Sequence, residues 1–247
     1  MASRRTIRPR RIELDARPEP LDLEGERTAV LVIGMQNDFG AKGGMLDRAG
    51  IDIGPVQRAV APTQRVLAAA RRAGLPIVYL KMAFRADLSD LGPLGAPNRA
   101  RHVAMNVGQQ TRAPDGRESR IMVRDTWNSD ILPELAPKAG DKVLYHHRPS
   151  GFFGTPLEDT LRELRADQLV VMGCTTSVCV ESTVRDAIDR DQQCVLIEDC
   201  MGEPIGSKMH RTNHDASVLA LQTMGTSVSD SRAFLWAVES ALAPTIG

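Results

Sequence analysis

Short apolar, β-rich runs alternate with helical patterns along nearly the whole chain, and this alternation restricts the fold more than any other feature. The run Thr28–Ile33 is continuous and β-branched, which is typical of a strand buried on both faces. Similar runs occupy residues 76–80, 142–145, 169–172, 193–197 and 226–228. Strands that alternate with helices predict an α/β fold: a three-layer αβα sandwich around a six-stranded, mostly parallel, Rossmann-like sheet.

The ends of these predicted strands are where a functional site is expected. In an open parallel sheet, ligands bind at the carboxyl ends of the strands. Gly34, Lys81, His146 and Cys179 all fall at such ends. The sequence therefore predicts a site at this edge, with a thiol, an imidazole and an ammonium group near one another.

Composition excludes several classes of function. The chain has 247 residues, with 31 Lys and Arg balanced by 31 Asp and Glu, so it lacks the basic excess of a nucleic-acid-binding surface. No apolar stretch approaches the roughly 20 residues that span a bilayer. The cysteines at 174, 179, 194 and 200 show no Cys-x-x-Cys spacing, which favours a reduced, cytoplasmic protein.

The N-terminus is basic and has no apolar stretch after it, so a cleaved signal is not expected. We expect residues 1–25 to form a basic arm, either mobile or in contact with another subunit, and residues 26–247 to form the domain. Residues 83–125 are polar and rich in glycine and proline. A segment of that length in a compact domain is usually a lid or a subunit contact.

Cys179 lies where a predicted buried strand turns into a helix. Gly173 ends the strand, and Val180, Val184 and Ile188 follow at helical spacing. Free N–H groups and the helix dipole at such a position favour a thiolate and lower the pKa of a cysteine. The same N–H groups can stabilise the oxyanion that forms when a thiolate attacks a carbonyl. The alternative is a small buried apolar residue, as most free cysteines are.

Three segments together resemble the isochorismatase-like cysteine hydrolases. They are Val-Ile-Gly-Met-Gln-Asn-Asp-Phe at 32–39, Arg-Pro-Ser-Gly-Phe-Phe-Gly-Thr-Pro-Leu at 148–157, and the loop at 173–183 that contains Cys179. Residues 43–50, 95–98 and 178–183 look most like those of ureidoacrylate amidohydrolases. The resemblance extends from about residue 28 to residue 229.

This resemblance implies a catalytic aspartate, lysine and cysteine. The cysteine is Cys179, but Gly34 occupies the aspartate position and His146 the lysine position. The backbone N–H groups of Thr175 and Cys179 are the implied oxyanion donors, and the peptide bond before Thr175 is expected to be cis.

His146 is the leading candidate for the missing base, because a Cys–His pair activates a thiol on other folds. The alternative is that it only fills the space of the lysine. Lys81 either binds a substrate carboxylate or is solvated. Asn37, Phe39 and Phe153 are expected to shape the substrate pocket, although Phe153 would also suit the core.

The resemblance implies a cysteine-dependent hydrolase of a C–N bond in a small amide, ureido or carbamoyl compound. A repurposed or inactive family member that binds a ligand or runs another reaction is the alternative, because two triad positions differ. No cofactor and no metal are expected. His210 and His214, four residues apart, indicate an exposed polar helix face. The resemblance further implies a homodimer or homotetramer, with a small-molecule substrate and neither a nucleic-acid nor a membrane partner.

Overall fold

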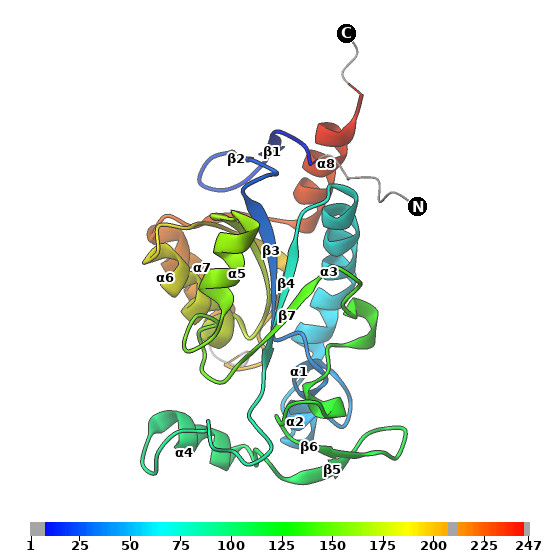
Figure 1. Ribbon diagram of the computed structural model, residues 1–247, viewed down its shortest axis with the longest axis vertical. Helices are drawn as coiled ribbons and strands as arrows, with labels where there is room; N and C mark the ends of the chain where they lie inside the picture. The colour runs from blue at the N-terminus through cyan, green and yellow to red at the C-terminus, as the bar shows by residue number, and fades with distance from the viewer. Residues whose placement is uncertain (1–7, 207–211, 245–247) are drawn as a thin grey trace.

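The central sheet has six strands, and every neighbouring pair is parallel. The computed structural model describes residues 8–206 and 212–244. The strand order is β10-β9-β8-β3-β4-β7 (Figure 1). The predicted fold class is therefore confirmed. The strands of this sheet are β3 (Thr28–Ile33), β4 (Ile77–Met82), β7 (Lys142–His146), β8 (Gln168–Cys174), β9 (Gln193–Gly202) and β10 (Ser227–Ser229).

Helices cover both faces of this sheet and complete the three layers. Helices α3 and α8 lie on one face, and α5, α6 and α7 lie on the other (Figure 1). The central strands β3 and β8 are buried along their whole length, which explains their unbroken apolar sequences. The helices are α1 (Asn37–Gly40), α2 (Met45–Arg48), α3 (Gly54–Arg72), α4 (Pro97–Ala104), α5 (Leu157–Leu164), α6 (Glu181–Ile188), α7 (Asn213–Thr223) and α8 (Ser231–Leu242).

The segment before residue 26 is part of the domain where the structure describes it. Strands β1 (Ile12–Leu14) and β2 (Leu21–Leu23) form an antiparallel hairpin that contacts α8. Ile12, Leu14 and Leu23 are fully buried. The expectation of an arm over residues 1–25 is therefore wrong for this hairpin, because its alternating apolar residues join the core. Residues 1–7 lie outside the described residues.

The long segment 83–125 contains regular elements of its own. Helix α4 and the hairpin of β5 (Gln110–Arg112) and β6 (Glu118–Arg120) extend beyond the carboxyl edge of the sheet, at the bottom of Figure 1. The segment packs against the core through buried Phe84, Ile121 and Met122. Within residues 8–206 and 212–244, no helix is long and apolar enough to cross a membrane.

Candidate active site

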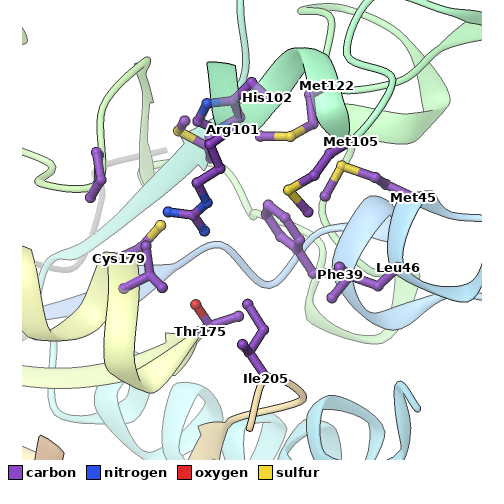
Figure 2. A pocket seen from close by; sticks show the side chains of 13 residues that line it. Phe39, Met45, Leu46, Arg101, His102, Met105, Met122, Thr175, Cys179 and Ile205 are labelled. Carbon is purple, nitrogen blue, oxygen red and sulfur yellow. The ribbon is translucent and has the colours of Figure 1, made fainter. Parts of the chain in front are cut away.

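A small cavity lies at the carboxyl ends of β4 and β8, between the tip of the sheet and α4. Its volume is about 30 Å³, which accommodates about one or two water molecules. The wall is mainly apolar, and Figure 2 shows its side chains converging on one space. The lining residues are Phe39, Met45, Leu46, Met82, Arg101, His102, Met105, Met122, Pro149, Thr175, Val178, Cys179 and Ile205.

Cys179 faces this cavity from a single π-helical turn, Thr176–Val180, that joins β8 to α6. It is only 6% exposed. Burial raises the pKa of the Cys179 thiol to about 11, although the charge of Arg101 and a hydrogen bond from the Thr175 backbone act in the opposite direction. The lowered pKa expected from the sequence is therefore not found, because desolvation outweighs the favourable neighbours.

Glu203 helps to explain why the helix start does not produce a thiolate. Its buried carboxylate accepts hydrogen bonds from the backbone N–H groups of Ser177 (2.6 Å) and Ile205 (2.9 Å). One N–H group of the π-helical turn is thus already bound, and the negative charge of Glu203 further raises the pKa of Cys179. The sequence does not reveal this contact, which depends on how β9 ends beside β8.

Thr175 lines the cavity next to Cys179, as the resemblance implies. The peptide bond between Cys174 and Thr175 is cis, as expected. The hydrogen bond that links the Thr175 backbone to the Cys179 thiol lowers the pKa of that thiol, as an N–H donor does. The structure thus places Thr175 beside Cys179, whose own backbone N–H group is the other predicted oxyanion donor.

Gly34 has no room for a side chain. Its φ is +63°, in the left-handed region, and a Cβ there would lie 2.3 Å from the carbonyl oxygen of Cys174. Its own carbonyl accepts a hydrogen bond from the Cys174 thiol at 2.8 Å. At the position that the resemblance assigns to the catalytic aspartate, the end of β3 therefore packs directly against Cys174 of β8.

His146 is fully buried at the end of β7 and does not line the cavity. Its Nδ1 lies 2.7 Å from the carbonyl oxygen of Arg148, so Nδ1 holds the proton and donates it. Nε2 then presents a lone pair and has no hydrogen-bond partner among the described residues. Burial lowers the pKa of His146 to about 4. The predicted Cys–His pair is not brought together at the cavity, and its imidazole does not titrate between pH 6 and 7.

Lys81 does not reach the cavity either. Its Nζ lies 3.3 Å from Asp130 Oδ1 and 3.2 Å from the Tyr145 hydroxyl oxygen. Successive side chains of a strand point to opposite faces, and the next residue, Met82, is the one that lines the cavity. Lys81 is thus directed away from the substrate space, which corrects its predicted role.

Only one of the three predicted pocket-shaping residues lines the cavity. Phe39 does so and is almost fully buried. Phe153 is 56% exposed and packs edge-on against His147, so it belongs neither to the cavity nor to the core. Asn37 is buried behind the site, where its Nδ2 donates to the Trp127 carbonyl at 2.7 Å, and it has no place on the cavity wall.

Two basic residues that sequence reasoning missed, Arg101 and His102, line the cavity from α4. The Nδ1 of His102 donates to the Asn98 carbonyl at 2.7 Å, and burial lowers the pKa of this imidazole. Figure 2 shows the guanidinium group of Arg101 directed toward Cys179. A helix start at Pro97 could have been predicted from the sequence, but not the position of this helix over the cavity.

Asp38 holds the methionine-rich wall in place. Its carboxylate accepts the backbone N–H groups of Met45 (2.9 Å) and Met122 (2.7 Å) and the side-chain amide of Asn128. Burial raises the pKa of Asp38 to about 6, against the effect of these three donors. Asp38 thereby ties α1 to α2 and to residues 121–123, which supply the wall.

Within residues 8–206 and 212–244, no cluster of three or more His, Cys, Asp or Glu side chains has the arrangement of a metal site. His214 instead lies with its Nδ1 3.0 Å from the Thr176 hydroxyl oxygen. His210, its predicted neighbour on a helix face, lies outside the described residues.

Comparisons with known proteins agree with this architecture. The isochorismatase domain model matches residues 28–233. The ureidoacrylate amidohydrolase RutB of Variovorax paradoxus is 36% identical over 210 residues, 85% of this chain and 81% of the relative. A cysteine hydrolase from Pseudomonas syringae pv. phaseolicola superposes with a TM-score of 0.72 at 28% identity, covering 89% of this chain and 95% of the other. An N-carbamoylsarcosine amidase from Thermoplasma acidophilum has a TM-score of 0.60 at 25% identity, with 83% and 96% covered. The chain therefore belongs to the isochorismatase domain family.

Proposed function

We propose that this protein hydrolyses a C–N bond in a small amide, ureido or carbamoyl compound, with Cys179 as the nucleophile. The observation that carries the proposal is that Cys179 and Thr175 share one wall of a small cavity at the carboxyl end of the sheet. Relatives named ureidoacrylate amidohydrolase and a structural neighbour named N-carbamoylsarcosine amidase support this class of substrate. The cavity's small volume also favours a compact substrate, for which the flexible methionines would have to move.

In this mechanism the Cys179 sulfur attacks the carbonyl carbon, and the N–H groups of Thr175 and Cys179 hold the oxyanion. The C–N bond then breaks and the thiol proton ends on the leaving nitrogen. An amide leaves a thioester and a ureido or carbamoyl compound leaves a thiocarbamate, until water releases the carboxylic or carbamic acid. With a pKa of about 11, only about one Cys179 in 10⁴ is ionised at pH 7. Proton removal must therefore accompany attack, and the neutral imidazole of His102 is the only uncharged nitrogen base among the side chains that line the cavity.

The second candidate function is ligand binding without hydrolysis. It is favoured by one observation, the absence of a carboxylate at Gly34, where the backbone has no space for one. In that case the cavity and Cys179 would remain, but turnover of amides would not.

Ammonia release from a panel of small ureido, carbamoyl and amide compounds, ureidoacrylate among them, separates these two functions. We expect release by the unaltered protein and by Cys194→Ala, a matched change of another buried cysteine on β9, and none by Cys179→Ala. No release from any compound, with a rise in melting temperature for one of them, would instead support ligand binding. Equal release by Cys179→Ala would refute the nucleophile.

A further inference from the structure

We propose that a cleft between α2 and the β5–β6 hairpin binds a small phosphate-bearing anion, at a site separate from the cavity that holds Cys179. The cleft has a volume of about 480 Å³. Figure 1 shows the hairpin beside α2, beyond the carboxyl edge of the sheet. None of the described residues that line the cleft also lines the cavity, and the proposed hydrolysis does not use it.

The cleft carries an excess of positive charge. Arg48 of α2, Arg112 of β5 and Arg120 of β6 line it. Glu118 is the one acidic residue among the described residues on its wall, and it lies opposite Arg112 across the hairpin. In the part of the chain that the structure describes, none of the three arginines forms an ion pair, whereas nearby Arg117 and Arg124 do. Their charges are therefore left for a ligand to neutralise.

Backbone carbonyl groups, rather than carboxylates, orient the three guanidinium groups. A carbonyl contact holds a guanidinium group in position without neutralising it, and N–H donors remain because each group has five. The accepting carbonyls are those of Gly43 for Arg48 (2.7 Å), Gly116 for Arg112 (3.3 Å), and Gly108 and Ala86 for Arg120 (3.0 and 2.8 Å).

A phosphate group suits this arrangement better than a carboxylate does. It carries about 1.5–2 negative charges at pH 7 and three strong acceptor oxygens. Guanidinium groups bind such oxygens through paired N–H donors. Thr111 also lines the cleft, and its buried hydroxyl has no hydrogen-bond partner among the described residues. The wall thus offers three cations and an unused hydroxyl to an anion with several oxygens.

A bound anion would also act on the wall of the cavity. Ser119, on the wall of the cleft, donates to Asn128 Oδ1 at 2.6 Å, and Asn128 donates to Asp38. The Asp38 carboxylate accepts the backbone N–H groups of Met45 and Met122. An anion that bridges α2 and the hairpin would therefore hold both methionines in place and slow the entry of a reagent to the cavity.

Isothermal titration calorimetry with inorganic pyrophosphate tests the site. We expect the unaltered protein to bind pyrophosphate, with an affinity that falls as sodium chloride is added, because the contacts are partly exposed. Arg48→Gln and Arg112→Gln should each weaken the affinity by about tenfold, because each removes a hydrogen-bonded charge contact. Arg117→Gln is the matched control, since it removes the same charge from the same hairpin. Arg117 pairs with Asp115 and does not line the cleft, so this variant should keep its affinity.

Alkylation of Cys179 by iodoacetamide, assigned by peptide mapping, measures the connection to the cavity. The pyrophosphate concentration is chosen to saturate the unaltered protein but not Arg48→Gln, and sodium chloride of equal ionic strength is the reference. Pyrophosphate should slow alkylation in the unaltered protein and in Arg117→Gln, and should leave the rate in Arg48→Gln nearly unchanged.

An absence of binding would overturn the inference, and so would an equal loss of affinity in all three variants, because an equal loss indicates diffuse surface charge. A single-stranded oligonucleotide that binds more tightly than pyrophosphate, and loses affinity in Arg48→Gln and Arg112→Gln, would assign the cleft to nucleic acid instead. Binding of pyrophosphate with an unchanged alkylation rate would refute the connection to the cavity wall. None of these measurements requires turnover, so they are independent of the proposed hydrolysis.

Discussion

Replacing Gly34 by alanine tests whether the backbone at this position requires a glycine. The φ of +63° is costly for any residue with a Cβ, by roughly 1–2 kcal/mol. The new Cβ would also lie 2.3 Å from the Cys174 carbonyl oxygen, a backbone atom that cannot rotate away. Overpacking of this kind costs roughly 1–3 kcal/mol more, so we expect a total loss of about 2–5 kcal/mol.

Gly43→Ala is the matched control. Gly43 also has a left-handed φ, +81°, but a Cβ added there would meet no other atom within 4 Å. Gly43→Ala should therefore lower the free energy of unfolding only by the cost of the left-handed backbone conformation, roughly 1–2 kcal/mol. In a protein of this size Gly34→Ala should melt about 4–20 °C below the unaltered protein, and Gly43→Ala about 2–8 °C below it.

Urea unfolding of both variants, followed by circular dichroism, measures the difference. A free energy of unfolding for Gly34→Ala equal to that of Gly43→Ala would refute the clash with Cys174. The same geometry predicts that Gly34→Asp, alone or with His146→Lys, destabilises the protein and does not raise turnover. A rise in turnover in either variant would show that β3 and β8 adjust to admit the aspartate.

Three further predictions concern the buried groups and the oligomeric state. Burial lowers the pKa of His146 from an ordinary 6.5 to about 4, so the folded protein disfavours protonation of this imidazole. Unfolding measured at several pH values should therefore show that the wild-type protein loses about 3 kcal/mol of stability relative to His146→Gln between pH 6.5 and pH 4. A difference between the two proteins that stays constant over this range would contradict the prediction. Asp38→Ala leaves three buried donors without an acceptor and should cost at least about 3 kcal/mol in urea unfolding, whereas a loss below about 1 kcal/mol would show that the wall does not depend on this carboxylate. We propose a homodimer or homotetramer, as the family resemblance implies, and light scattering that gives a monomer mass at micromolar concentration would rule it out.

The fold was predictable because its signal is local. Each strand of the sheet is an apolar run of a few residues, which can be recognised without knowledge of its neighbours. The hairpin β1–β2 was missed because Ile12 and Leu14 stand among charged residues and become core residues only through contact with α8.

The candidate site was predictable only in part. Cys179, Thr175 and Phe39 follow from motifs at strand ends, and all three line the cavity. Lys81 was wrongly predicted to face the site, because side chains alternate along β4 and it is the next residue, Met82, that lines the cavity. Arg101 could not be located from the sequence, because its position depends on the path of a long segment that local patterns do not determine.

The expectation of a depressed thiol pKa failed for a related reason. A helix start favours a thiolate locally, but desolvation depends on everything packed around the sulfur. Here the methionines, Phe39 and the carboxylate of Glu203 come from separate parts of the chain. Their combined effect exceeds that of the Thr175 N–H group and Arg101.

The central claim is that Cys179 forms a covalent bond with the substrate during C–N cleavage. Rapid acid quenching during turnover of a small ureido compound, followed by peptide mass mapping, tests it most directly. We predict an acyl adduct on the peptide that contains Cys179, removed by hydroxylamine and absent from Cys179→Ala, which should also release no ammonia. Ammonia release at the wild-type rate by Cys179→Ala, with no adduct on any cysteine, would contradict the account.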